Sequence, residues 1–198
     1  MSHEIRTPLN AILGFSRIIA ETDNSEERLQ YYDIVEKNNM RLQELINEIL
    51  DLSKIESGMM EFNYAPVNLY KLCDDVKNTY RFRCQSGVDL IFEQSDRSLY
   101  ISTDRNRLFQ IFSNLIGNAT KFTQKGHISF GYKKVDNQII FHVTDTGTGI
   151  PAEKLPKIFD RFMMANDNVA GTGLGLSISK IIAEKLGGKI WVNSKPGK

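Results

Sequence analysis

The chain has 198 residues, of which 41% are hydrophobic, and this is enough for one ordinary domain and a smaller module. Lys and Arg number 25 and Asp and Glu number 24, so the near-neutral charge argues against nucleic acid as a partner. Cys73 and Cys84 lack metal-ligand spacing and indicate a reducing, cytosolic setting, and no apolar run approaches the ~20 residues of a membrane span.

The first 58 residues show the pattern of two helices. Apolar side chains recur at helical spacing from Ile5 to Ile19, and a polar stretch over residues 21–25 ends the pattern. Asn24 and Glu27 could form a capping box that begins a second, longer helix, whose apolar period continues to Gly58. Because one hairpin cannot cover both of its apolar stripes, we expect two copies to form a homodimeric four-helix bundle.

Beyond Gly58 the pattern changes to alternating strands and helices. We expect helices over residues 69–84, 104–122 and 173–186, and strands over 88–92, 99–101, 128–132, 139–143 and 189–192. The sequence therefore predicts an α+β protein in which residues 1–60 form a helical hairpin. Residues 61–198 form a second domain, in which a sheet packs against helices.

A histidine, a carboxylate and a hydroxyl lie within two turns of the first helix. His3 and Thr7 fall opposite the apolar stripe, so we expect the imidazole to face solvent and to act as a nucleophile toward phosphorus. Glu4 could orient that ring and accept its proton, and Thr7 could hold a water. Pro8 is expected to disrupt the helix nearby. Taken alone, a surface histidine next to a glutamate is more often a solvated side chain than a functional one.

Three polar residues line one flank of the expected helix over 104–122, namely Asn114, Asn118 and Lys121, at spacings of i, i+4 and i+7. An amide oxygen is a hard donor that suits Mg²⁺, and Asn118 is the better candidate ligand. Lys121 would meet phosphate groups. The alternative is that these asparagines only bond solvent.

The expected strand over 139–143 runs on to Asp145, Gly147 and Gly149. Alternation places Asp145 on the covered face, where its carboxylate needs a partner such as the exocyclic amine of a purine. The two glycines would let the backbone approach a flat ring. The same letters also describe a tight turn after a strand.

A glycine-rich segment, Gly171 to Leu176, opens the last expected helix. The free N–H groups there would bind phosphates. The segment is neither a Walker loop nor a good dinucleotide fingerprint. Residues 163–170 could close over a nucleotide as a lid. Arg161 could reach the terminal phosphate, or it could pair with Asp160 or Glu153 on the surface.

These motifs in this order resemble the sensor histidine kinases of two-component signalling, over nearly the whole chain. The matching segments are residues 3–8, 114–123, 145–149, 159–162 and 171–175. The resemblance implies that His3 is phosphorylated, that Glu4 is its acid–base partner, and that Thr7 is linked to phosphatase activity.

The resemblance also implies the nucleotide contacts. Asn118 would bind magnesium, Asn114 and Lys121 would contact phosphates, Asp145 would recognise adenine, and Arg161 would assist catalysis. The remaining nucleotide-binding residues would come from the two glycine-rich segments, namely Gly147, Gly149, Gly171, Thr172, Gly173, Leu174 and Gly175.

The implied activity is that of an ATP-dependent protein-histidine kinase. It would transfer the γ-phosphoryl group of Mg-ATP to His3 and then to an aspartate of a response-regulator receiver domain, and it could also act as phosphatase. The implied second domain is the sandwich shared with gyrase, MutL and heat-shock-chaperone ATPases. The family usually adds one more strand after residue 198, so we expect an unpaired sheet edge.

The implied location is the cytoplasmic portion of an inner-membrane sensor, attached through segments upstream of this chain. Two other functions stay open. One is a dimerising module that binds ATP and transfers nothing, and the other is a plain ATPase of the wider superfamily.

Overall fold

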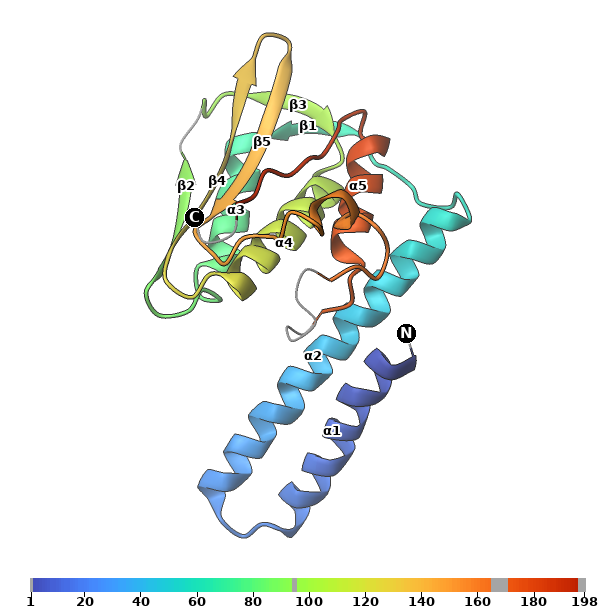
Figure 1. The fold of residues 1–198 in the computed structure, drawn as a ribbon, viewed down its shortest axis with the longest axis vertical. Coiled ribbons are helices and arrows are strands. Elements are labelled where there is room, and N and C mark those ends of the chain that lie inside the picture. The colour runs from blue at the N-terminus through green and yellow to red at the C-terminus, as the bar shows by residue number, and fades with distance from the viewer. Residues whose placement is uncertain (1, 94–95, 165–170, 196–198) are drawn as a thin grey trace. The chain divides into compact units, whose positions relative to one another are not determined.

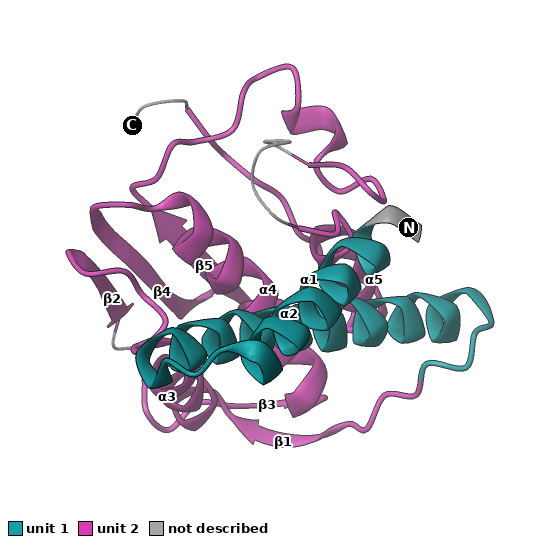
Figure 2. Cartoon of the chain, turned by 90° about the horizontal axis from the view of Figure 1, so that it is seen from below, with its two compact units in different colours: residues 1–60 teal, residues 61–198 magenta. Residues whose placement is uncertain are grey.

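Figure 1 shows the computed structural model of the chain, which describes residues 2–93, 96–164 and 171–195. The chain forms two compact units, Met1–Met60 and Glu61–Lys198, which are coloured separately in Figure 2. Within the described ranges, no helix is both long and apolar enough to cross a membrane.

The first unit is an antiparallel pair of helices, α1 (Ser2–Glu21) and α2 (Ser25–Glu56). Asn24 caps α2, because its Oδ1 accepts a hydrogen bond from the Glu26 N–H at 3.0 Å. Glu27 accepts from the Asn24 side-chain amide at 3.3 Å, and not from the backbone N–H that a capping box uses. The predicted hairpin is confirmed, with a slightly different cap.

Helix α1 continues through Pro8, which is buried. The expectation that this proline disrupts the helix is therefore wrong. A proline inside a helix removes the hydrogen bond to the carbonyl four residues back, here that of Glu4, but residues on both sides keep their helical backbone.

Much of the apolar surface of the hairpin stays exposed. In the described part of α2, Leu45 and Leu52 are buried, and Phe15 of α1 stacks on Tyr31 with ring centroids 5.6 Å apart. Other large apolar side chains are more than a third exposed, including Leu9, Leu13, Ile18, Leu29, Tyr32, Met40, Ile46 and Leu50. A single hairpin thus leaves a broad apolar face uncovered.

The second unit carries five strands and three helices of more than one turn in the described residues. In chain order they are β1 (Ala65–Asn68), α3 (Leu69–Tyr80), β2 (Val88–Glu93), β3 (Tyr100–Thr103), α4 (Arg105–Phe122), β4 (Gly126–Val135), β5 (Gln138–Asp145) and α5 (Gly175–Lys185). A short 3₁₀ turn, Leu155–Lys157, precedes α5. In the larger sheet the order is β2-β4-β5, with β2 parallel and β5 antiparallel to β4, while β1 and β3 form a separate antiparallel pair.

The core of this unit lies between the helices and one face of the larger sheet (Figure 1). Leu72 and Val76 of α3 and Phe112 of α4 pack against Phe130 and Tyr132, which alternate along β4. All five side chains are at most 2% exposed. The predicted sandwich of a sheet and helices is confirmed.

The structure of this unit differs from the expectations in three ways. Residues 189–192 form no strand, although Ile190, Trp191 and Val192 are β-favouring, because a strand also needs backbone hydrogen bonds to a neighbour. Helix α3 ends at Tyr80, four residues before the expected end. The short strand β1 and the 3₁₀ turn were not expected at all.

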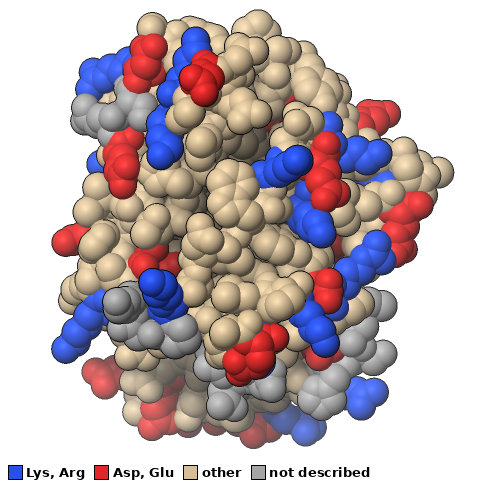
Figure 3. Space-filling model, turned by 45° about the horizontal axis from the view of Figure 1, so that its top comes forward, with Lys and Arg blue, Asp and Glu red and all other residues tan. Residues whose placement is uncertain are grey.

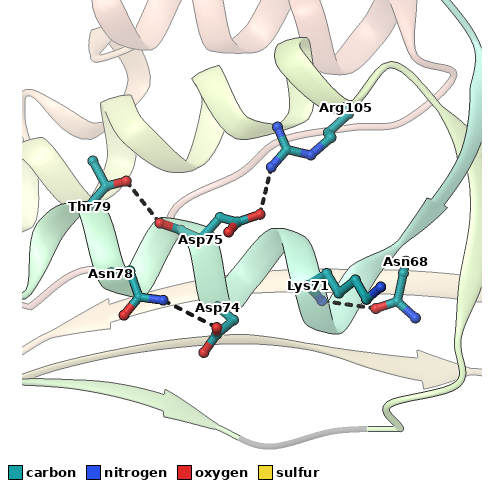
Figure 4. A network of polar contacts seen from close by, with 7 residues as sticks. All are labelled: Asn68, Lys71, Asp74, Asp75, Asn78, Thr79 and Arg105. Atoms are coloured by element: carbon teal, nitrogen blue, oxygen red, sulfur yellow. Dashed lines mark hydrogen bonds and ion pairs between the residues drawn. The ribbon is translucent and has the colours of Figure 1, made fainter.

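Side-chain caps fix the starts of α3 and α4. Asn68 accepts from the Lys71 N–H at 2.9 Å, and an ion pair of 2.6 Å between Asp75 and Arg105 joins the two helices (Figure 4). Asp104 caps α4 by accepting from the Arg107 N–H at 3.0 Å, and its other oxygen accepts from the Asn63 N–H at 2.8 Å.

Charged side chains of both signs are interspersed on the face that Figure 3 shows, among uncharged residues. No broad area of that face carries a single sign, as expected for a net charge of +1.

Candidate nucleotide site and phosphoacceptor helix

Helix α4 carries the three polar residues predicted to meet metal and phosphates. Asn114 and Asn118 are half-buried and Lys121 is exposed. The Asn114 side-chain nitrogen, Nδ2, donates to the Gly175 carbonyl oxygen at 3.0 Å and to Ser179 Oγ at 3.1 Å. Asn114 therefore joins α4 directly to the first turn of α5, which follows the second glycine-rich segment.

Asp145 is the last residue of β5, and its carboxylate is exposed. The expectation of a covered carboxylate is wrong, because the core packs on Phe141 and Val143 and does not extend to the end of the strand. Asp145 Oδ1 accepts a hydrogen bond from the Gly147 N–H at 2.9 Å. This bond holds the carboxylate at the start of the glycine-rich turn.

Gly147 lies against the end of α4. A Cβ atom added there would come within 2.6 Å of the Phe122 carbonyl oxygen, which already accepts from the Thr148 N–H at 3.3 Å. Only glycine fits this approach without a shift of the backbone. Gly149, two residues on, has a φ of 71°, which also favours glycine. The structure thus brings the first glycine-rich segment and the Asn114–Phe122 stretch together.

The second glycine-rich segment is joined in the same way to the segment around Arg161. The Phe162 N–H donates to the Gly173 carbonyl at 2.9 Å, and a Cβ atom on Gly173 would lie 2.5 Å from the Phe162 carbonyl carbon. Both residues have positive φ, 62° for Phe162 and 68° for Gly173. A non-glycine residue with this φ is uncommon and strained, and the backbone hydrogen bond to Gly173 helps to hold Phe162 in it.

Helix α5 begins at Gly175 and has eleven residues. The Leu174 N–H donates to Thr172 Oγ1 at 3.1 Å, and Leu174 is buried, so the turn before the helix is fixed. Among the described residues, no side chain caps the N-terminus of α5. The N–H groups of its first turn and its dipole therefore suit an anionic group. A Cβ atom added at Gly171 would meet no atom of the described residues within 4 Å.

Arg161 is exposed and lines a pocket beside α5 together with Asp160, Lys180 and Glu184. The contact of Arg161 with the terminal phosphate stays a prediction. The predicted lid over 163–170 falls largely outside the described residues, which stop at 164 and resume at 171.

The phosphoacceptor candidates lie in the first turns of α1. Glu4 is half-buried and Thr7 is exposed, and the two lie three residues apart on the helix. His3 belongs to the same helix, but its side chain is outside the part of the chain that the structure describes. Its predicted exposure to solvent stays a prediction.

No group of three His, Cys, Asp or Glu side chains that could hold a metal occurs among the described residues. Burial raises the pKa of Cys73 to about 12, so this thiol is protonated at neutral pH. Mg²⁺ keeps several waters and shares its shell with phosphates, so the single amide of Asn118 fits it.

Two contacts in this region carry no sequence signal. Ser179 is fully buried, yet a lone serine in a predicted helix does not indicate a partner 65 residues away. Phe122 acts through its backbone carbonyl, which no side-chain pattern reveals.

Two family models match the chain. Residues 1–58 match the His Kinase A (phospho-acceptor) domain, and residues 103–198 match the histidine kinase-, DNA gyrase B- and HSP90-like ATPase family. The chain is 38% identical to the sensor protein GacS of Pseudomonas syringae pv. syringae, and 34% identical to the aerobic respiration control sensor protein ArcB of Escherichia coli. Both alignments cover 100% of this chain, but only 23% of GacS and 26% of ArcB, so the chain spans about a quarter of the length of these curated relatives.

Solved structures agree with these matches. Full-length ShkA in complex with AMPPNP has a TM-score of 0.77 and 31% identity, with 100% of this chain and 42% of that chain covered. The nucleotide-free catalytic domain of the histidine kinase ThkA has a TM-score of 0.59 and 32% identity, and the match covers 70% of this chain and 97% of that domain. With both segments matched in order, the chain belongs to the family of two-component sensor histidine kinases.

Proposed function

We propose that the chain is the catalytic core of a sensor histidine kinase, with residues 1–60 as the dimerisation and phosphoacceptor domain and 61–198 as the ATP-binding domain. The observation that carries this proposal is the approach of Gly147 to the Phe122 carbonyl, which sets Asp145 beside the end of α4. Such a backbone cradle, with a carboxylate at its edge, suits the flat ring and exocyclic amine of adenine.

The triphosphate would lie along α4 and the start of α5. Lys121 is an exposed cation on α4, and the uncapped first turn of α5 offers N–H groups after Gly173 and Leu174. The Asn114 contact to Gly175 supports this arrangement, because it links the two elements that would share the phosphates.

Asn118 would hold magnesium through its amide oxygen, together with phosphate oxygens and water. When bound, the ion supplies positive charge that offsets the charge on the phosphates. Arg161 would add a second positive charge near the terminal phosphate, where charge develops as the bond to ADP lengthens.

In the transfer step, a nitrogen of the His3 imidazole attacks the γ-phosphorus, and the bond to the bridging oxygen of ADP breaks with its electron pair on that oxygen. Glu4, the next residue of the helix, would accept the imidazole proton. Thr7 would hold the water that hydrolyses the phosphoramidate when the protein acts as phosphatase. The phosphoryl group would otherwise pass to an aspartate of a receiver domain.

The proposed partner of the receiver class is supported by a solved structure of ThkA in complex with the response regulator protein TrrA, with a TM-score of 0.68 and 27% identity. That match covers 100% of this chain and 60% of that chain. Membrane attachment through upstream segments stays a prediction.

A homodimer is part of the proposal. Leu13 is 63% exposed and Leu29 is 70% exposed, and both belong to the uncovered apolar face of the hairpin. A helical hairpin that leaves many large apolar side chains in water is usually covered in a bundle, so a second hairpin is the expected cover.

The test separates the kinase from the scaffold and the plain ATPase. Wild type, His3→Gln and Asn118→Ala are incubated with Mg²⁺ and γ-labelled ATP, and protein-bound label and free phosphate are measured separately. The kinase predicts protein-bound label on wild type alone. Nucleotide binding without label on wild type would support the scaffold, and phosphate release that His3→Gln leaves unchanged would support the ATPase.

A further inference from the structure

Asn114 holds the N-terminal half of α5 at two points. Its side-chain nitrogen donates to the carbonyl oxygen of Gly175 and, one turn further along α5, to the hydroxyl of Ser179. A carbonyl oxygen can only accept, so the nitrogen of the amide must face α5. Both hydrogen bonds of this nitrogen are directed at α5, and the expected contact of Asn114 with a phosphate stays a prediction.

Ser179 is an unusual residue for its surroundings. It is 0% exposed, and Ile178 and Ile182 of the same helix are also 0% exposed. A hydroxyl removed from water costs free energy unless it is hydrogen-bonded. An alanine would pack in the same space, so core packing alone does not explain why residue 179 carries a hydroxyl.

The hydrogen bond between Asn114 and Ser179 lies next to the proposed nucleotide contacts, and this position suggests a role for the hydroxyl. Asn118 lies one helical turn from Asn114 on the same flank of α4, and Gly175 begins the turn whose N–H groups would face the phosphates in the proposed site. The contact therefore sets how far the Asn118 amide lies from those N–H groups. Mg²⁺ demands a near-ideal octahedral shell at short distances, so it is sensitive to this spacing.

We propose that Ser179 is a positioning residue which, by accepting the hydrogen bond of Asn114, fixes the spacing between Asn118 and the first turn of α5. In this way it sets how strongly Mg²⁺ raises the affinity for a nucleoside triphosphate. The inference rests on the proposed function, because it assigns a role toward the metal and phosphates of that same site. Ser179 touches neither of them and acts through Asn114.

The experiment measures the dissociation constant of a non-hydrolysable ATP analogue by calorimetry, with Mg²⁺ and with EDTA, for wild type and Ser179→Ala. We expect Ser179→Ala to lose affinity about tenfold with Mg²⁺, the effect of one buried hydrogen bond of about 1.4 kcal/mol. With EDTA we expect a change of less than about twofold, because a misplaced metal ligand then has no consequence.

The matched control is Ser177→Ala. Ser177 lies in the same helix and is 3% exposed, but its hydroxyl donates to the Leu174 carbonyl of its own helix at 2.8 Å. We expect its affinities with Mg²⁺ and with EDTA to change by the same factor. An equal loss with and without Mg²⁺ in Ser179→Ala would overturn the positioning role, because it would show that the hydroxyl only holds the helix.

A second variant covers the case in which Ser179→Ala does not fold cooperatively. Ser179→Cys is similar in size, and its sulfur is a weaker acceptor, so we expect a smaller loss that is still confined to the Mg²⁺ measurement. If the wild-type chain binds no nucleotide, both the proposed function and this inference are refuted. If wild type binds and both Ser179 variants match it with Mg²⁺, the inference alone fails.

Discussion

The carbonyl oxygen of Phe122 lies 2.6 Å from the position that a Cβ atom on Gly147 would occupy. These two residues are 25 positions apart and join the end of α4 to the turn after β5. The turn that presents Asp145 is therefore held by backbone atoms, and it tolerates no side chain at residue 147.

Gly147→Ala should lower both stability and nucleotide affinity. The methyl group must displace the end of α4 or the turn, and such overpacking costs about 1–3 kcal/mol of unfolding free energy. Denaturant unfolding and calorimetric nucleotide binding measure the two effects. The control is Gly117→Ala, because a Cβ atom there meets no described atom within 4 Å and a helical Gly→Ala change stabilises by about 1 kcal/mol. Equal stability of the two variants would contradict the cradle.

Asp104→Asn should destabilise the second unit at neutral pH and much less in acid. Burial alone would raise the Asp104 pKa, but hydrogen bonds from the backbone N–H groups of Arg107, Asn63 and Asn106 outweigh it, and the pKa lies below its ordinary value of 3.8. Because the folded pKa is depressed, the stabilisation is complete above the unfolded value and is lost as the pH falls through the folded one.

Denaturant midpoints of wild type and Asp104→Asn, measured from neutral to acid pH, test this linkage. We expect the difference between the two proteins to shrink below about pH 4, where the unfolded carboxyl begins to protonate. A difference that stays constant over the whole range would show that the carboxylate charge is not what ties Asn63 to the start of α4.

Leu13→Glu should separate the proposed dimer into monomers. Burial of a leucine contributes about 1.5–3 kcal/mol, and a dimer contains two copies of Leu13, so the dissociation constant should rise by at least about a hundredfold. Sedimentation over a range of protein concentrations measures it. Gln30→Glu adds the same charge at an exposed polar position of α2 that helical periodicity places away from Met40, Ile46 and Leu50, and it should leave the association unchanged. A wild-type chain that stays monomeric at high concentration would refute the dimer.

The hairpin could be predicted because its apolar period is long and regular, and both helices appear within a few residues of the expected limits. The prediction of a strand over residues 189–192 was wrong for a physical reason. Strand propensity depends on the side chains, whereas a strand forms only where a neighbouring backbone pairs with it. Just after these residues, the side chain of Ser194 accepts a hydrogen bond from the Ile150 N–H at 2.8 Å. Strand β1 was missed because Pro66 and Asn68 obscure a four-residue pattern.

In the candidate site, too, some features could be predicted from the sequence and others could not. Motif residues such as Asn114 and Asp145 could be selected from the sequence, because their chemistry and spacing are unusual. The contacts that these residues make could not be predicted from the sequence. The Asn114 bonds to α5 and the exposure of Asp145 depend on where helices cross and where the core ends, which are tertiary properties.

The most direct test of the central claim is to locate the phosphoryl group in the protein. After incubation with Mg-ATP and work-up in alkali, which preserves phosphohistidine, mass spectrometry of the N-terminal peptide should place the group on His3. Asn118→Ala, in which residue 3 is intact and the proposed metal ligand is lost, should carry far less. A phosphoryl group on Thr7 or on any other hydroxyl, or none on the wild-type chain with nucleotide bound, would contradict the account.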